Sequence, residues 1–348
     1  MALSEYYFER INKQLKTNNF IFPPSIEIDL TNKCYQDCYY CNVHDFRKNF
    51  PDVGTKEDYL KLIDLLPKED CYDITFAGGG DPLANKDANE IFNYSLKKEF
   101  KVGIITNGMG IDKLTFNKQY HPTWIGIDID SGNEKDYFKI RKGNLNKVIK
   151  GIENIIDEFK SYGTEMTFKC LVNNYNNTKK QFKESIELAS KTGFDMFFVR
   201  VAHFKIGHII QPETTWDDLE QYLKEQCEKN NIRLSGSFEK EKDFLINKNK
   251  GSKFIEKCFG PMFSIIFAAD GKIYWCTEYR GNKEYEMGDW IKNSLKELYS
   301  NNYIKEMKEF DKCHKCSHQC RFYENFKFVD KIINGLENKD AGHKVGFF

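Results

Sequence analysis

The sequence contains no apolar run long enough to cross a bilayer, and residues 1–20 lack the continuous apolar core of a signal peptide. Neither sign of charge is in excess, because 52 Lys and Arg residues are matched by 52 Asp and Glu residues. We therefore expect a cytoplasmic protein that binds neither nucleic acid nor a membrane. In that reducing compartment the 11 cysteines are poor candidates for disulfides, so those that cluster are better explained as metal ligands.

Short apolar, β-branched or aromatic runs alternate with longer amphipathic runs from residue 22 onward, which is typical of βα units around a mainly parallel sheet. The amphipathic runs predict helices that include 56–67, 146–163 and 179–193. The apolar runs predict strands over 25–30, 73–78, 101–107, 124–130, 167–173 and 196–202. These units favour an α/β fold with a partial (β/α)6 TIM-like barrel, and an open sheet is the alternative.

The alternation weakens after about residue 203, which divides the chain into several predicted parts. These are an N-terminal extension over 1–21, the barrel over 22–215, a connecting helix and linker over 216–245, a small cysteine-rich domain over 246–325 and a C-terminal tail over 326–348. Parallel βα folds bind ligands at the carboxyl ends of their strands. The stretch LTNKCYQDCYYCNV, which follows the first predicted strand, therefore lies on the functional side of the fold.

That stretch holds Cys34, Cys38 and Cys41, and a disulfide, a zinc ion or an iron-sulfur cluster can explain three thiols so close in the chain. A tetrahedral zinc site needs a fourth ligand, which His44 can supply. A cubane cluster instead takes three thiolates and leaves one iron open, and an open coordination site implies reactivity.

The spacing C-x3-C-x-aromatic-C, with Tyr40 at the aromatic position, resembles the radical S-adenosylmethionine (SAM) family. In that family the open iron of a [4Fe-4S] cluster chelates the amino and carboxylate groups of SAM. The later segments FAGGGDPL, IITNGM and IDIDSGNEKDYFKIRKG resemble the family's other SAM-binding segments, in the same order. Together they imply a SAM site that contains Tyr40, Gly79, Gly80, Asp81, Pro82, Thr106, Asn107, Asp128, Asp130 and Arg141.

The resemblance gives some of these residues particular roles. Asp81 stands where the family usually has Glu in a Gly-Gly-Glu-Pro segment that hydrogen-bonds the methionine amino group. Asp128 stands where a Ser often meets the ribose hydroxyls, and Asp130 is expected on the same strand face. Arg141 corresponds to an arginine that often helps to hold the SAM carboxylate.

A second set of cysteines begins with Cys258, and a predicted β-hairpin around ADGK brings it to the same end as Cys276. Cys313 and Cys316 can complete a four-thiolate site, with Cys320 as an alternative ligand, and zinc suits this pattern as well as iron and sulfide do. The order C-x12-G-x4-C followed by C-x2-C resembles the twitch-type relative of the SPASM domain. That resemblance implies one auxiliary [4Fe-4S] cluster in a β-hairpin plus helix domain.

The resemblance implies reductive cleavage of SAM to a 5'-deoxyadenosyl radical, which abstracts hydrogen from a substrate carbon. A dehydrogenase or other tailoring enzyme of a sugar, an aminocyclitol or a related small molecule is the leading expectation, with flavodoxin or ferredoxin as the external electron donor. The alternatives are a peptide-modifying maturase, a redox-neutral epimerase, lyase or decarboxylase, and a non-catalytic zinc protein. Residues 1–21 are expected to be too short for a leader-peptide recognition domain.

The remaining candidates have weaker signals. Isolated cysteines usually behave as small buried hydrophobes, which is the expectation for Cys71, Cys170 and Cys227. Polar residues at the ends of the fifth and sixth strands are either ordinary strand-end residues or contacts for substrate or adenine; they are Lys169, Asn173, Arg200 and His203. Two histidines beside the late cysteines, His314 and His318, are expected near the cluster but not as ligands. No residue stands out as a catalytic acid or base.

Overall fold

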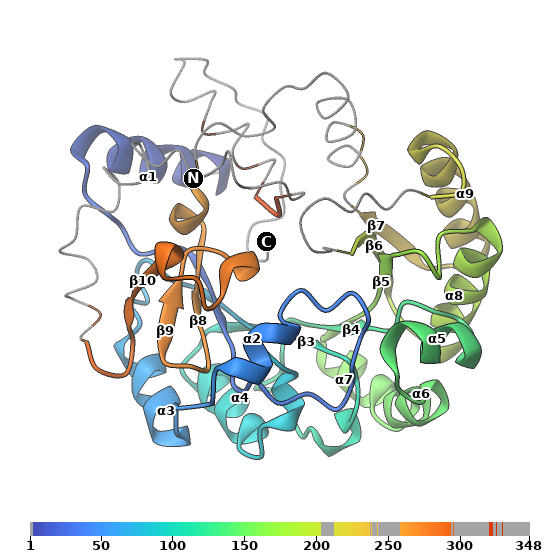
Figure 1. Ribbon diagram of the computed structural model, residues 1–348, viewed down its shortest axis with the longest axis horizontal. Helices are drawn as coiled ribbons and strands as arrows, with labels where there is room; N and C mark the ends of the chain where they lie inside the picture. The colour runs from blue at the N-terminus through green and yellow to red at the C-terminus, as the bar shows by residue number, and fades with distance from the viewer. Residues whose placement is uncertain are drawn as a thin grey trace.

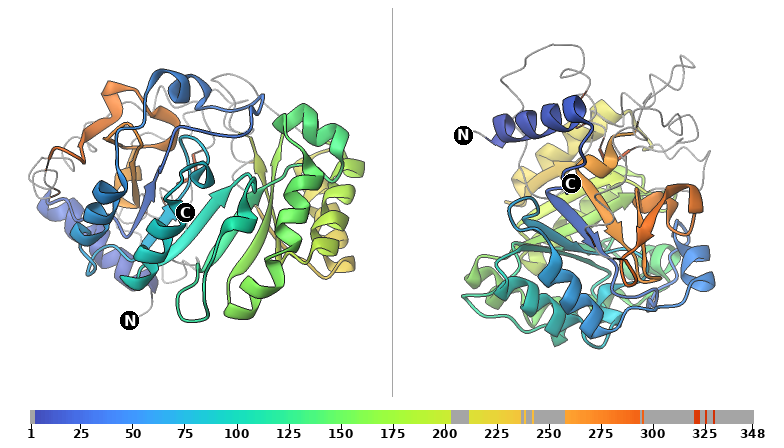
Figure 2. Two further views of the ribbon diagram at one scale, coloured as in Figure 1. Left: turned by 90° about the horizontal axis from the view of Figure 1, so that it is seen from below. Right: turned by 90° about the vertical axis from the view of Figure 1, so that its left-hand side faces the viewer.

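The computed structural model describes residues 3–202, 212–236, 258–293 and 320–322, together with positions 238, 242, 295, 325 and 329. Its backbone forms a curved sheet with helices around the outer side (Figure 1, Figure 2). Within the described part of the chain, no helix is long and apolar enough to cross a membrane.

The described strands form one sheet in the order β10-β9-β8-β1-β2-β3-β4-β5-β6-β7. Pairing is parallel from β8 to β7 in this order and antiparallel at β8–β9 and β9–β10. The strands are β1 (Ser25–Ile28), β2 (Asp73–Phe76), β3 (Lys101–Thr106), β4 (Trp124–Asp128), β5 (Glu165–Val172), β6 (Met196–Val201), β7 (Arg233–Gly236), β8 (Ser264–Phe267), β9 (Lys272–Tyr274) and β10 (Glu286–Asp289). The predicted α/β fold with a parallel, partly closed barrel is confirmed.

Several helices begin at a residue whose side chain caps the first turn, and these are α3, α5, α6, α8 and α9. Thr178 and Gln181 form a capping box at the start of α8, and Gly193 ends that helix in the left-handed region, as predicted. The predicted helix over 146–163 is instead two helices, α6 and α7. The described helices are α1 (Leu3–Thr17), α2 (His44–Asn49), α3 (Lys56–Leu65), α4 (Ala88–Lys97), α5 (Glu134–Arg141), α6 (Leu145–Glu153), α7 (Ile156–Tyr162), α8 (Lys179–Thr192) and α9 (Trp216–Lys229).

The two faces of the sheet differ in polarity. Phe76 contacts the ring of Phe92 on α4, and Phe168 contacts Phe194 just after α8, so the apolar side chains of β2 and β5 point outward to the helices. Along each strand, the residues that alternate with these outward-pointing side chains face the concave side of the sheet. On β1 and β5 these include Glu27 and Lys169, so the interior of the partial barrel carries charged groups.

Two strands extend the barrel beyond the expectation of six units. β7 pairs in parallel with β6, although its residues fall in the segment that was expected to be a linker after the helix α9. The predicted hairpin is present as β8 and β9, with Gly271 in the left-handed region at its turn. β8 also pairs in parallel with β1, so the hairpin continues the barrel sheet. The predicted boundary near residue 245 and most of the predicted tail lie outside the described residues.

Candidate active site

The cysteine loop, residues 30–43, leaves the carboxyl end of β1 and runs to α2. Its three cysteines are partly exposed and none forms a disulfide. The backbone N–H groups of Asp37 and Tyr39 donate to the carbonyls of Arg141 (3.3 Å) and Ile140 (3.2 Å) at the end of α5. These hydrogen bonds bring the predicted Arg141 to the cysteines.

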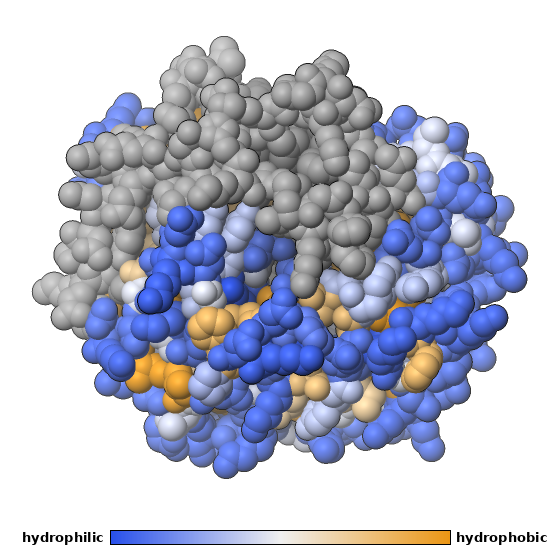
Figure 3. All heavy atoms as spheres, in the orientation of Figure 1, coloured by the Kyte–Doolittle hydropathy of each residue, from blue (hydrophilic) through white to orange (hydrophobic). Residues whose placement is uncertain are grey.

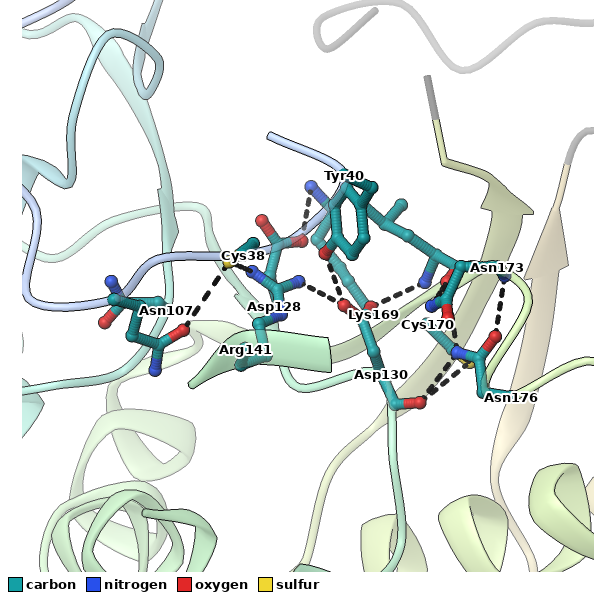
Figure 4. A network of polar contacts seen from close by, with 12 residues as sticks. Cys38, Tyr40, Asn107, Asp128, Asp130, Arg141, Lys169, Cys170, Asn173 and Asn176 are labelled. Atoms are coloured by element: carbon teal, nitrogen blue, oxygen red, sulfur yellow. Dashed lines mark hydrogen bonds and ion pairs between the residues drawn. The ribbon is translucent and has the colours of Figure 1, made fainter. Parts of the chain in front are cut away.

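Two side chains donate hydrogen bonds toward the cysteine sulfurs. Asn107 Nδ2 lies 3.4 Å from Cys34 Sγ, and Arg141 Nη1 lies 3.6 Å from Cys38 Sγ (Figure 4). Burial raises the pKa of the Cys38 thiol to about 12, and the Arg141 charge opposes that rise. A Cys38 thiolate therefore needs positive charge beside it, and a bound metal would add to what Arg141 supplies. Polar donors around thiolate sulfur suit an iron-sulfur cluster, so the residues present fit one.

The glycine segment after β2, residues 78–82, packs its backbone against the cysteine loop. The N–H of Gly80 donates to the carbonyl of Thr31 (2.7 Å), and the N–H of Asp81 donates to the carbonyl of Lys33 (2.8 Å). A Cβ atom at Gly80 would lie 1.9 Å from the Lys33 carbonyl oxygen. Gly79 has a φ of +58°, which side chains disfavour. Glycine at these positions therefore allows the approach of the two loops.

The carboxylate of Asp81 is occupied by its own chain. It accepts hydrogen bonds from Thr106 Oγ1 (2.9 Å) and from the backbone N–H groups of Asn107 (2.6 Å) and Leu83 (2.9 Å). Burial raises its pKa to about 6, and these donors oppose the rise. A SAM contact from this side chain stays a prediction. What the structure places here is a carboxylate that joins the loops after β2 and β3.

Asp130, Arg141 and Tyr40 form a buried unit beside Cys38 (Figure 4). Arg141 Nη2 lies 2.6 Å from Asp130 Oδ2, the Tyr40 hydroxyl donates to the same carboxylate, and the Asp130 side chain is fully buried. The Arg141 guanidinium also lies over the Tyr40 ring, 5.4 Å from its centroid. Arg141 therefore already has a carboxylate partner from the chain itself.

Asp128 and Asp130 do not share a strand face as expected. Asp128 ends β4, is partly exposed and lies 3.2 Å from the ammonium of Lys169 on β5. Asp130 has a φ of +65°, which interrupts the strand alternation and turns its side chain toward Arg141. The sequence pattern contains no signal for this left-handed residue beyond the tolerance of Asp for that conformation.

Two asparagines hold the loop after β5: Asn173, a candidate from the sequence, and Asn176, which sequence reasoning missed. The Tyr39 hydroxyl donates to Asn173 Oδ1 (3.0 Å), which ties this loop to the cysteine loop. Asn176 Nδ2 donates to the carbonyl of Asp130 (2.7 Å), and Asn176 Oδ1 accepts from the N–H of Asn173 (2.7 Å). The run NNYNN was the available signal, because Asn side chains favour such turns.

The other early candidates have simpler surroundings. His44, the candidate fourth zinc ligand, has its Nδ1 3.1 Å from an Asp37 carboxylate oxygen. Among the described residues, no three Cys, His, Asp or Glu side chains gather as ligands of one metal ion would. Cys71, Cys170 and Cys227 are buried, as expected of isolated cysteines.

The described part of the second cysteine set lies around the hairpin. Cys258 precedes the 3-10 helix η3 (Gly260–Met262), Cys276 follows β9, and both are partly exposed, as is Cys320. Burial raises the pKa of the Cys276 thiol to about 12, and the nearby Glu278 carboxylate adds to the rise. The expected ligands Cys313 and Cys316, and the histidines His203, His314 and His318, lie outside the described residues.

A buried charge network, which was not predicted from the sequence, joins β1 and the residue after it to this second region. Arg280 Nε lies 2.6 Å from the Asp29 carboxylate, and its Nη2 also donates to Glu27. Arg321, next to Cys320, lies 2.7 Å from Glu27. A Cβ atom at Gly78 would lie 2.0 Å from Arg280 Nη2, so the guanidinium occupies space that only glycine leaves. The network therefore contacts the glycine segment of the candidate SAM site.

Comparison with known proteins assigns both cysteine regions to families. Residues 28–170 match the radical SAM superfamily, and residues 258–321 match the SPASM iron-sulfur cluster-binding domain. The chain therefore contains a radical SAM domain and, after it, a SPASM domain. These domains imply a [4Fe-4S] cluster with SAM and auxiliary iron-sulfur binding, as expected.

Several curated proteins match part of the chain. The antilisterial bacteriocin subtilosin biosynthesis protein AlbA of Bacillus subtilis (strain 168) is 31% identical over 40% of this chain and 32% of its own length. A probable GTP 3',8-cyclase of Methanocaldococcus jannaschii is 30% identical over 38% of this chain and 45% of its own. An S-adenosylmethionine-dependent nucleotide dehydratase of Selenomonas ruminantium is 31% identical over 32% of this chain and 40% of its own length. The chain thus spans less than half the length of these relatives.

A solved structure shares the fold. SuiB of Streptococcus suis has a TM-score of 0.64 at 14% identity, over 86% of this chain and 70% of that one.

Proposed function

We propose that the protein cleaves SAM reductively at a cluster bound by Cys34, Cys38 and Cys41 and uses the resulting radical to abstract hydrogen from a substrate carbon. When bound, the cluster would supply the electron that releases methionine and a 5'-deoxyadenosyl radical. The observation that carries this proposal is the environment of the cysteine loop. Asn107 and Arg141 donate hydrogen bonds to its cysteine sulfurs, and the glycine segment packs against its backbone. Binding at one strand edge orients the reactants and excludes water.

The chain's own residues divide these tasks. Asn107 and Arg141 stabilise thiolate charge on Cys34 and Cys38, which their distances to sulfur support. The backbone at Gly80 and Pro82 lets SAM approach closely, and Asp128 accepts hydrogen bonds from its ribose hydroxyls. Asp81 and Asp130 act as positioning residues, and Thr106 and Tyr40 are the donors that hold them.

For the second region, we propose one auxiliary [4Fe-4S] cluster whose ligands include Cys258 and Cys276, completed by two of Cys313, Cys316 and Cys320. A cluster with four thiolates can accept the second electron of an oxidation, with the proton passing to solvent. An oxidation of a small molecule is therefore the leading proposal. Two of the curated relatives act, by their names, on GTP or on nucleotides, which supports a small-molecule substrate.

A peptide substrate is the second candidate. The matching region of AlbA, a bacteriocin biosynthesis protein by name, favours it, and SuiB, which shares the fold, is known bound to its precursor peptide SuiA. The external electron donor in either case is proposed to be a flavodoxin or ferredoxin. The free thiols of all described cysteines support a reducing, cytoplasmic setting.

Anaerobic reconstitution tests this function. We expect about eight iron and eight sulfide per chain for two [4Fe-4S] clusters, and 5'-deoxyadenosine formation with dithionite and SAM. The Cys34→Ala, Cys38→Ala, Cys41→Ala triple variant should lose about half the iron and all SAM cleavage. Colourless protein that contains zinc, or SAM cleavage by the triple variant, would contradict the proposal.

A further inference from the structure

Two basic residues are neighbours on the concave face of the sheet, near the carboxyl ends of β5 and β6. The strand register pairs Lys169 with Phe198 and Leu171 with Arg200, so Lys169 and Arg200 are diagonal neighbours. Residues of the opposite face are buried against the helices, whereas these two are partly exposed. Lys169 and Arg200 therefore point into the partial barrel, beside the candidate SAM site.

The Arg200 guanidinium lacks a carboxylate partner among the described residues, and its buried Nε has no hydrogen-bond partner. The Lys169 ammonium pairs with one carboxylate among the described residues, that of Asp128, with 3.2 Å between Lys169 Nζ and Asp128 Oδ1. Burial lowers the pKa of Lys169, which is the direction expected when an ammonium group has too little negative charge around it.

The other interior carboxylates are committed elsewhere. Asp130 pairs with Arg141, and Arg280 pairs with Glu27 on β1 and with Asp29 just after that strand. This corner of the barrel thus holds more positive than negative charge. A half-buried guanidinium without a partner is costly unless a ligand supplies the missing anion.

We propose that Lys169 and Arg200 form a subsite for an oxyanion of the substrate, a phosphate or a carboxylate. This inference rests on the proposed function, since it names the chemistry of the substrate that the radical attacks. The planar guanidinium matches two oxygens of such a group, and the ammonium acts as a point charge beside it. Asp128 holds Lys169 in place at the border between this subsite and the SAM site.

Binding of simple anions to the reconstituted protein tests the subsite without any turnover. We expect inorganic phosphate or acetate, at constant ionic strength, to raise the thermal unfolding midpoint of the wild type in a saturable way. Arg200→Gln and Lys169→Gln should each weaken that binding about tenfold, and Arg200→Lys should weaken it less. Arg233→Gln is the matched control, because Arg233 lies on the next strand at the opposite end and pairs with Glu165.

The comparison of phosphate with acetate tells which oxyanion the subsite prefers. Equal anion affinity in wild type, Arg200→Gln and Lys169→Gln would overturn the proposal. A loss of SAM affinity in Arg200→Gln, measured by equilibrium dialysis, would also overturn it, because the anion would then be the SAM carboxylate. Anion binding by wild type that fails to cleave SAM would instead contradict the proposed function alone.

Discussion

Gly80 lies where two backbones meet, and its missing side chain is a requirement of the site. The Lys33 carbonyl oxygen would be 1.9 Å from a Cβ atom at this position. Because the contact is with backbone, no rotamer change relieves it. The cysteine loop and the glycine segment would have to separate to admit a methyl group.

We expect Gly80→Ala to weaken SAM binding at least about tenfold, because it displaces the glycine segment from the cysteine loop. Equilibrium dialysis with SAM measures this effect. Gly151→Ala is the control, since a Cβ there would make only an ordinary 3.4 Å contact with Ile111 on the outer helix layer. Unchanged SAM affinity in Gly80→Ala would show that the segment does not shape the site.

The ionisation of Asp73, at the start of β2, is expected to make the stability of the fold depend on pH. Its side chain is buried, one carboxylate oxygen lacks a hydrogen-bond partner, and burial raises its pKa from 3.8 to about 7. Protonation is therefore easier in the folded state than in the unfolded state. The contribution of Asp73 to stability is full below pH 3.8 and is lost as pH rises to about 7.

Asp73→Asn removes this penalty, so we expect it to stabilise the protein at pH 8 by about 1–3 kcal/mol. The gain should shrink as pH falls toward 5. Unfolding midpoints of variant and wild type across this pH range check the prediction. Asp64→Asn, at an exposed carboxylate paired with Lys98, should show no such gain. A gain that is independent of pH would contradict the assignment to Asp73 ionisation.

Single residues also mark the limit of sequence reasoning. The motif order located Cys34, Asn107 and Arg141, and the structure brings them together. The partners of Asp81 and Asp130 were not predictable. They depend on which loop ends the fold brings close and on one left-handed backbone conformation.

At the scale of elements, the cysteine loop is held between α5 and the hairpin. α2 packs Phe46 against Tyr274 of β9, and Asn42 Nδ2 donates to Glu278 (2.7 Å), two residues after Cys276. Arg280 adds a buried ion pair between the same region and Glu27 on β1. The two cysteine regions are therefore mechanically connected.

We expect Arg280→Gln to destabilise the protein by about 3–5 kcal/mol, because it leaves two buried carboxylates with too little positive charge. Denaturant unfolding of the reconstituted protein measures the loss. Adding Asp29→Asn should restore part of it, since the uncompensated carboxylate is removed. Arg233→Gln, at an exposed pair, should cost less than about 1 kcal/mol. Equal losses in the two arginine variants would refute the role of the buried network.

The hydrophobic pattern predicted most of the strands and helices of the barrel. The strand β7 and the pairing of β8 with β1 were not predicted, for physical reasons. β7 is short and lies at one end of the described sheet with half-exposed residues, so it lacks an apolar signature. The pairing of β8 with β1 joins segments more than 230 residues apart, and local patterning carries no information about such contacts.

For the whole molecule, both cysteine regions follow strands of one continuous sheet, in which only β8 separates β1 from β9. The described part of the face in Figure 3 is mostly hydrophilic, with small separate apolar groups. The chemistry is expected inside the barrel, where Asp128, Lys169 and Arg200 lie.

The central claim is that SAM binds the cluster held by the cysteine loop. Electron paramagnetic resonance of the dithionite-reduced protein, recorded before and after SAM addition, tests it most directly. In wild type and in Cys71→Ala, we predict two [4Fe-4S] signals, of which SAM changes one. In the Cys34→Ala, Cys38→Ala, Cys41→Ala variant, only the signal that SAM leaves unchanged should remain. A SAM-responsive signal in that variant would contradict the account.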